Sequence, residues 1–132
     1  KLQGSQRVAL EDNGRRRNRG DNKRNRVLKQ SRSFVFRRFL HDTFGLDLLR
    51  SGSGVIDVAG GKGELSFELQ NLSEVPTTTL DPRIANLRQF YSKWDRGFYG
   101  RNTFWAEYSP GFRADRKPVA PAEARIFLEK PL

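Results

Sequence analysis

Residues 55–66 read VIDVAGGKGELS, a short β-branched run that leads directly into a turn rich in glycine. Glycines bound the run 55–58 on both sides, a pattern typical of a buried strand in a parallel sheet. Leu65, Leu69 and Leu72 follow at helical spacing, which predicts a helix over residues 64–72. We therefore expect a strand, a tight turn and a helix in succession.

A second strand is predicted at residues 77–80, which read TTTL and follow Pro76. Asp81 comes directly after it. Strand, glycine-rich turn, helix, strand and acid form the first half of a nucleotide-binding α/β unit. In such a unit, glycines let a ligand approach the backbone, and the free N–H groups at the helix start favour an anionic group. The carboxylate of Asp81 would then accept the hydroxyls of a ribose.

Two common phosphate-binding motifs do not fit the turn. The nicotinamide fingerprint G-x-G-x-x-G, started at Gly61, reaches Ser66 where the third glycine should stand. A P-loop needs its lysine after the second glycine, but Lys62 precedes Gly63. Residues 57–66, DVAGGKGELS, instead resemble motif I of the class I S-adenosylmethionine-dependent methyltransferases. Ala59 departs from that motif, since a glycine usually stands there.

The resemblance covers about residues 31–132 and includes the segment WDRGFYGRN at 94–102. It implies S-adenosyl-L-methionine as cofactor, with Gly61 and Gly63 along its methionine part, Asp57 orienting the turn and the amino group, and Asp81 holding the ribose. The expected fold class is α/β: a Rossmann-like class I methyltransferase fold that is partial, with only its first strands and helices. The candidate cofactor-binding residues are Asp57, Ala59, Gly60, Gly61, Lys62, Gly63 and Asp81.

The catalytic residues are unknown at this stage. In the family, acceptor-binding and catalytic groups come mainly from the fourth strand onward, whereas about 50 residues follow Asp81 here. They contain a predicted helix with Ile84, Leu87, Tyr91 and Trp94 on one face and a last strand at 125–128, but no N-P-P-Y-like tetrapeptide and no Cys. We therefore expect a protein partner or a further segment to complete the sheet.

A helix is also predicted from Ser31, a plausible N-cap, to the stop at Gly45. Phe36, Phe39, Leu40 and Phe44 recur at helical spacing and are expected to form its core-facing stripe. Arginines 32, 37 and 38 are expected to form a basic face. His41 has no partner that the sequence identifies, so we assign it no function.

The net charge of +10 belongs to the start of the chain, because residues 1–38 carry 13 Lys and Arg against 3 Asp and Glu. Residues 1–30 are too polar to form a core, which predicts a disordered or extended basic arm ahead of a domain at 31–132. A solvated tail or the remnant of a targeting peptide is the other interpretation. The candidate nucleic-acid-binding residues are Arg15, Arg16, Arg17, Arg19, Lys23, Arg24, Arg26 and Lys29.

Aromatic and basic residues alternate over 96–113, as in surfaces that stack on unpaired bases. We favour the simpler interpretation that these rings fill the core of a small domain. With no Cys and one His, a disulfide scaffold and a structural zinc site are excluded, and no metal site is predicted. No run is long and apolar enough for a membrane helix, so we expect an intracellular protein, in the cytosol, nucleus or an organelle such as the mitochondrion.

Two functions remain. The first is an S-adenosylmethionine-dependent methyltransferase, or the cofactor-binding half of one, acting on RNA or on an RNA-associated protein. The alternative is a non-catalytic structural subunit of a ribonucleoprotein, such as an organellar ribosome, that keeps a degenerate methyltransferase fold and is anchored by its basic arm. The presence of further strands beyond those predicted here would favour the enzyme.

Overall fold

The computed structural model of the protein describes residues 32–101 and 103–127, without the side chains of 103–105. The predicted basic arm and its eight candidate nucleic-acid contacts lie outside these residues. The elements, in chain order, are α2 (Arg32–Phe44), α3 (Leu46–Arg50), β1 (Val55–Val58), α4 (Glu64–Asn71), β2 (Thr77–Leu80), α5 (Arg88–Asp95), the 3-10 helices η1 (Phe98–Gly100) and η2 (Thr103–Tyr108), and β3 (Ala122–Ala124).

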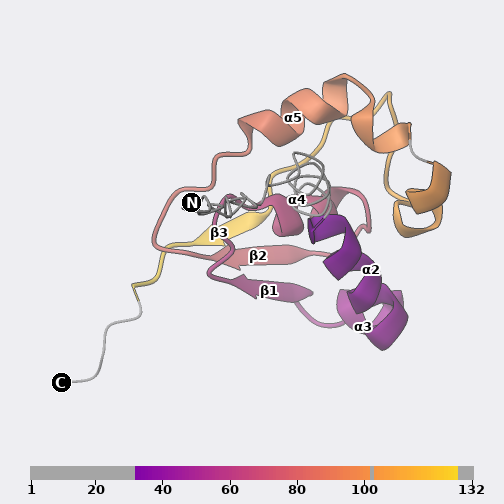
Figure 1. The fold of residues 1–132 in the computed structure, drawn as a ribbon. Helices are drawn as coiled ribbons and strands as arrows, with labels where there is room; N and C mark the ends of the chain where they lie inside the picture. The colour runs from indigo at the N-terminus through magenta and orange to yellow at the C-terminus, as the bar shows by residue number, and fades with distance from the viewer. Residues whose placement is uncertain (1–31, 102, 128–132) are drawn as a thin grey trace, which may run out of the picture. The chain divides into compact units, whose positions relative to one another are not determined.

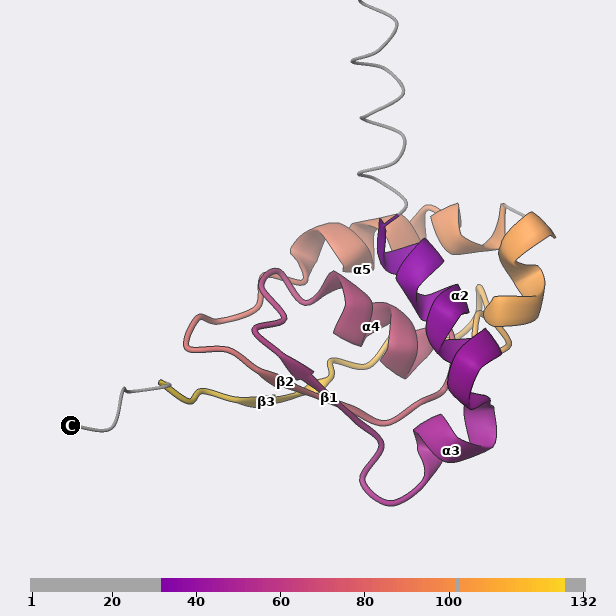
Figure 2. The ribbon, with the colours of Figure 1, turned by 60° about the horizontal axis from the view of Figure 1, so that its bottom comes forward.

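The three strands form a parallel sheet in the order β1-β2-β3 (Figure 1). Val55 pairs with Thr77 and Val58 with Leu80, while Leu80 also pairs with Ala124. The helix α4 makes the crossover between β1 and β2, and both ribbon views show α2, α4 and α5 on the same side of the sheet (Figures 1 and 2). The fold is thus mixed α/β with a small parallel sheet, which is compatible with a partial Rossmann-like fold.

Aromatic side chains fill the space between the helices. Phe67 of α4 is fully buried and lies with its ring centroid 5.6 Å from that of Phe90 and 6.1 Å from that of Tyr99. Trp94 and Tyr99 are each only 3% exposed. The interpretation that rings after Asp95 serve the core is confirmed for Tyr99 and for the partly buried Phe112. It is wrong for Phe98, which is 47% exposed. The rings at 104 and 105 lie outside the described side chains.

The strand β1 is parallel, as predicted, but it is not buried. Ile56 and Val58 are 60% and 59% exposed, because their side chains lie on the sheet face away from the helices. Among the described residues no strand pairs with the outer edge of β1, so this strand closes one side of the sheet. Its apolar composition is therefore that of an interior strand in an edge position.

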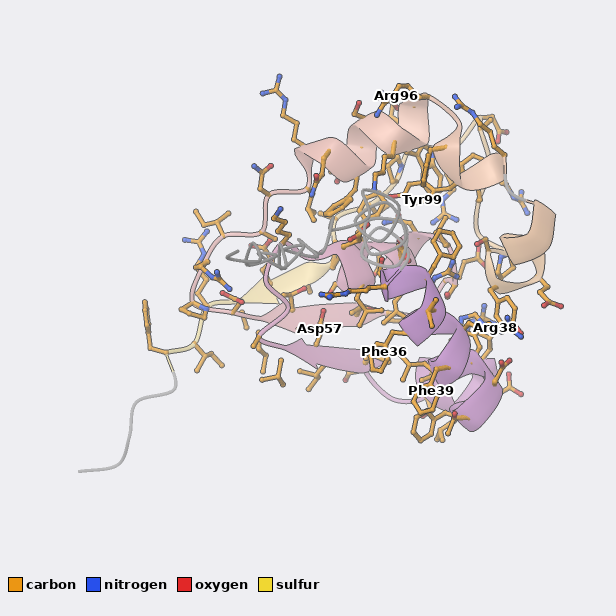
Figure 3. All side chains as sticks on the ribbon, viewed as in Figure 1. Phe36, Arg38, Phe39, Asp57, Arg96 and Tyr99 are labelled. Carbon is orange, nitrogen blue, oxygen red and sulfur yellow. The ribbon has the colours of Figure 1, made fainter. Side chains whose placement is uncertain are left out.

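The helix at the start of the domain has the predicted range, but a different face of it is buried. Phe36, Phe39 and Phe44 are 47%, 53% and 48% exposed, so their expected role in a core stripe is wrong. Leu40 is the exception, because it is partly buried against the core cluster of Leu49, Leu69 and Val75. Figure 3 shows Phe36 and Phe39 extending outward from α2, where their rings stack with centroids 5.9 Å apart. The buried face of α2 carries Phe34 and Arg37 instead.

Arg37 is not part of a basic surface, as the sequence indicated, but is completely buried. Its Nε donates to Glu68 Oε2 at 3.4 Å, and its other nitrogens donate to the hydroxyls of Ser73 and Ser109 and to the carbonyl of Tyr108. Burial raises the pKa of Glu68 to about 7 although Arg37 opposes this rise. The network joins α2 to α4 and to the segment that follows η2.

His41 lies at the edge of this network, with its Nε2 2.8 Å from the Ser73 hydroxyl. Burial, followed by the positive charge of Arg37, lowers the pKa of His41 to about 4. The histidine is therefore neutral at physiological pH, and its contacts are structural.

The last strand differs from the prediction of 125–128. It covers Ala122–Ala124, and residues 125–127 continue without a partner strand. The reason is that β2 ends at Leu80, whose pair is Ala124, and Pro82 beyond it has no N–H to continue the ladder. The helix α5 begins only at Arg88, which leaves Ile84 outside it and 65% exposed. In the described parts of the chain, no helix is long and apolar enough to cross a membrane.

Candidate functional site

The glycine-rich turn leaves the carboxyl end of β1 and enters α4 at Glu64. A Cβ on Gly60 would lie 2.8 Å from both Asp57 Oδ2 and Thr79 Cγ2, so only glycine fits there without displacing a neighbour. Gly61 has a φ of 59°, and no atom lies within 4 Å of the place where its Cβ would be. The turn is thus packed against the sheet at Gly60 and open at Gly61, which suits the close approach of a ligand to the backbone.

Asp57 connects the strand before the turn to the helix after it. Its Oδ2 accepts the Ser66 hydroxyl at 2.7 Å, and Ser66 in turn accepts the Thr79 hydroxyl at 2.8 Å. This chain of hydrogen bonds connects β1, the first turns of α4 and β2. These contacts place Asp57 between the strand before the turn and the helix after it; its role in orienting the turn and the amino group stays a prediction. Ser66 and Thr79 were not expected to take part.

Asp81 is buried at the carboxyl end of β2 and reaches the turn directly. Its Oδ2 accepts the Gly61 N–H at 3.0 Å, which unites two residues that lie 20 positions apart. Its Oδ1 accepts the Arg83 backbone N–H at 2.8 Å and the Arg83 Nε at 3.1 Å. These hydrogen bonds from Arg83, and a weaker one from Gly61, lower the pKa of Asp81 to about 2. The carboxylate is therefore charged at any physiological pH.

Arg83 was not predicted as part of the site. Its side chain is 74% exposed, whereas the carboxylate that it contacts is 3% exposed. The guanidinium thus closes the site from the solvent side and occupies lone pairs that a ribose would otherwise use. The spacing Asp81-Pro82-Arg83 was the available signal, because a proline between them forces a turn that brings the two side chains together.

Lys62 projects from the turn towards α5, where it helps to line a cavity of about 420 Å³. The cavity is bounded on the other side by the start of α5 and the loop before it. Gly63, the last turn residue, faces this loop, since a Cβ there would lie 3.1 Å from Leu87 Cδ2 and 3.2 Å from Ala85 Cβ. The lining residues are Lys62, Asn86, Arg88, Gln89 and Ser92.

The structure brings the predicted cofactor residues to one edge of the sheet. Gly61 contacts Asp81, Gly60 packs on Asp57, and Lys62 lines the neighbouring cavity. Sequence reasoning missed Arg83 and the residues of α5 that line the cavity. A periodicity pattern indicates which face of a helix is polar but not what lies opposite to it, so no signal for this cavity existed.

Ala59 has a φ of 58°, a left-handed conformation that is unfavourable for a residue with a Cβ. We expect Ala59→Gly to stabilise the protein by about 0.5–1 kcal/mol, because relief of this strain exceeds the added freedom of glycine in the unfolded chain. Urea unfolding would measure the change. Ala114→Gly, at a position with no positive φ, is the control and should lower stability; a loss for Ala59→Gly as well would contradict the strain.

No known protein family, curated protein or solved structure matches the chain in sequence or fold comparison. The likeness to the methyltransferases therefore rests on the sequence resemblance alone, at residues 57–66 and 94–102.

Proposed function

We propose that the chain is the cofactor-binding half of an S-adenosylmethionine-dependent methyltransferase that acts on RNA or on an RNA-associated protein. One observation carries the proposal: a glycine-rich turn after one parallel strand lies in hydrogen-bond contact with a buried acid at the end of the next, between Gly61 and Asp81. In open α/β sheets, ligands bind outside the carboxyl ends of the strands. Both residues lie at that edge.

The residues fit such a cofactor in three respects. The open side of Gly61 leaves room for the ligand against the backbone. Asp81 is charged and placed to accept the two ribose hydroxyls once the exposed Arg83 side chain moves aside. Asp57 keeps Gly60 and the start of α4 in position. The bound cofactor would supply the methyl group, and these residues would hold and orient it.

The acceptor side of such a site would lie beyond the outer edge of β1. In doubly wound sheets the crevice lies where the strand order reverses, next to the first strand. In the part of the chain that the structure describes, β1 has no neighbour on that edge, and Ile56 and Val58 are exposed beside it. We infer that further strands, from a partner or a further segment, pair with β1 to complete the catalytic half.

Calorimetric titration of S-adenosylhomocysteine into the chain, and separately into the assembly purified with it, tests the proposal. We expect micromolar binding that Asp81→Ala weakens about tenfold or more, because hydrogen bonds to a charged group are lost. Arg83→Ala should tighten binding, since it frees the Asp81 carboxylate. Asp115→Ala removes an exposed acid elsewhere and is the control.

Either of two results would contradict the methyltransferase proposal. If neither the chain nor its assembly binds S-adenosylhomocysteine, or if Asp81→Ala binds it with unchanged affinity while thermal melting shows an intact fold, the methyltransferase proposal fails.

A second candidate function is a structural subunit of a ribonucleoprotein, without catalysis. The contact between Arg83 and Asp81 favours it, because both carboxylate oxygens already have partners within the chain. In this case Arg83→Ala would only destabilise the protein, and no variant would bind S-adenosylhomocysteine.

A further inference from the structure

The cavity between the glycine-rich turn and α5 differs from a nucleoside pocket. Its lining consists of two cations, Lys62 and Arg88, and three neutral polar side chains from Asn86, Gln89 and Ser92. Pockets for small organic ligands are usually lined by apolar and aromatic groups. Among the described residues, no acidic or hydrophobic side chain lines the cavity, and the apolar part of its surface comes from the stems of these polar residues. The two cations therefore favour an anionic group there.

The two cations of the cavity are not neutralised. Nearby, Arg83 pairs with Asp81, and Lys93 pairs with Glu64 at 3.4 Å. Within the described residues, neither Lys62 nor Arg88 makes an ion pair. Two cations without an acidic partner that face one cavity make its electrostatic potential more positive, which favours an anion. A concave site with low-dielectric walls concentrates that potential.

The helix α5 extends this positive surface away from the cavity. Arg96, labelled in Figure 3, follows its last residue; its side chain is exposed, and its Nε donates back to the Ser92 carbonyl at 3.2 Å. Residues 88–96 hold three cations, Arg88, Lys93 and Arg96, against one acid, Asp95, so this helix carries a net positive charge. Such a line of charges fits an extended polyanion better than a single ion.

An exposed aromatic ring lies next to the far end of α5. Phe98 is 47% exposed, and Lys93 Nζ lies 5.2 Å from the centre of its ring. Tyr99, its neighbour, is buried in the core and makes an edge-on contact with it. An exposed aromatic ring beside a cation is a surface on which an unpaired base can stack.

We propose that the cavity is a phosphate site for the backbone of single-stranded RNA, which follows α5 so that an unpaired base stacks on Phe98. This inference deepens the proposed function and rests on it for the biological role of the site. RNA bound here would lie beside the turn that we propose binds the cofactor. Binding itself requires only the residues named, and can be measured without any cofactor.

The test is an NMR titration of the full chain with labelled backbone amides. The probes are the dinucleotide UpU, octauridylate, the phosphate-free nucleoside uridine, and inorganic phosphate. We expect UpU and octauridylate to shift the amides of Lys62, Gln89 and Ser92, and uridine to leave them unchanged. Octauridylate, which has more phosphates and more bases than UpU, should bind more tightly and also shift the ring protons of Phe98.

Two variants with equal loss of charge make the test specific. Lys62→Ala combined with Arg88→Ala should weaken octauridylate binding at these amides about tenfold, because two phosphate contacts are lost. Arg113→Ala combined with Lys117→Ala removes two exposed cations outside the cavity and should change this affinity less than about twofold. The proposal is overturned if the two double variants behave alike, if the cavity amides do not shift, or if inorganic phosphate binds them as tightly as octauridylate.

These outcomes are independent of the cofactor. RNA shifts at the cavity without S-adenosylhomocysteine binding would support the phosphate site and remove the methyltransferase. Cofactor binding without RNA-induced shifts would support the methyltransferase and exclude the phosphate site.

Discussion

Replacement of Arg37 by Ala is expected to destabilise the protein by about 3–5 kcal/mol, the usual effect of removing one partner of a buried ion pair. Arg37 is fully buried and Glu68 is 1% exposed, so the variant leaves a carboxyl group without its cation in the interior. It also removes the donor that the Ser109 hydroxyl accepts from, and it leaves the Ser73 hydroxyl with its contact to His41 but without its second one. The loss thus combines an uncompensated acid with unsatisfied polar groups.

Urea unfolding at neutral pH would measure this loss, with Arg116→Ala as the matched control. Arg116 pairs with Glu74 at 3.3 Å, but both side chains are about two-fifths exposed. A surface pair of this kind contributes less than about 1 kcal/mol. If the two alanine variants lose equal stability, the buried network does not hold α2 in place as argued.

The loss at Arg37 should depend on pH. The pKa of Glu68 in the folded protein, about 7, exceeds its ordinary value of 4.5, so the folded state holds this proton more tightly than the unfolded state. The contribution of Glu68 is therefore full below pH 4.5 and is lost as the pH rises to about 7. Without Arg37 the pKa rises further, and the decline should continue above neutral pH.

His41 has the opposite effect in an overlapping range. Its pKa of about 4 lies below its ordinary value of 6.5, so its contribution is present above pH 6.5 and is lost as the pH falls to about 4. The comparison of wild type with Arg37→Ala is therefore sharpest above pH 7, where His41 is neutral in both states. Equal pH dependence of the two proteins in that range would exclude an unpaired Glu68 as the cause.

The order of elements around the turn could be predicted from the sequence, and burial could not. The sequence predicts strands at residues 55–58 and 77–80, because β-branched runs there are bounded by turn residues. Local patterns do not indicate how many strands a sheet has, so the sequence could not predict that β1 lies at an edge. The same limit applies to α2, in which a phenylalanine stripe looks like a core face although Arg37, on another face, has Glu68 as its partner.

The candidate site was predictable to the extent that topology determines it. Parallel strands joined by one crossover bring their carboxyl ends together, so Gly61 and Asp81 had to lie close to each other once both strands were assigned. The state of the acid was not predictable. Whether Asp81 faces solvent, a ligand or Arg83 depends on the turn that starts at Pro82, and the cavity beside Lys62 depends on where α5 begins.

A comparison of a buried with an exposed phenylalanine, Phe67 and Phe36, offers the second large prediction. Phe67→Ala should destabilise the protein by about 3–5 kcal/mol, because it leaves a cavity where a fully buried ring stood. That ring lies between Phe90, Tyr91, Trp94 and Tyr99, with centroid distances from 5.6 to 6.4 Å. These neighbours belong to α5 and η1, so their collapse onto the gap would also move the wall of the cavity.

Phe36→Ala removes the same atoms from the exposed side of α2 and should lower stability by less than about 1 kcal/mol, since its ring is about half exposed and stacks on Phe39, which is itself exposed. Urea unfolding of both variants, with sedimentation to record their mass, gives the comparison. A large loss for Phe36→Ala in a monomeric chain would mean that the periodicity identified the core correctly and that α2 is turned the other way. A large loss accompanied by dissociation of a complex would instead show that a second polypeptide covers this face of α2, beside the unpaired edge of β1.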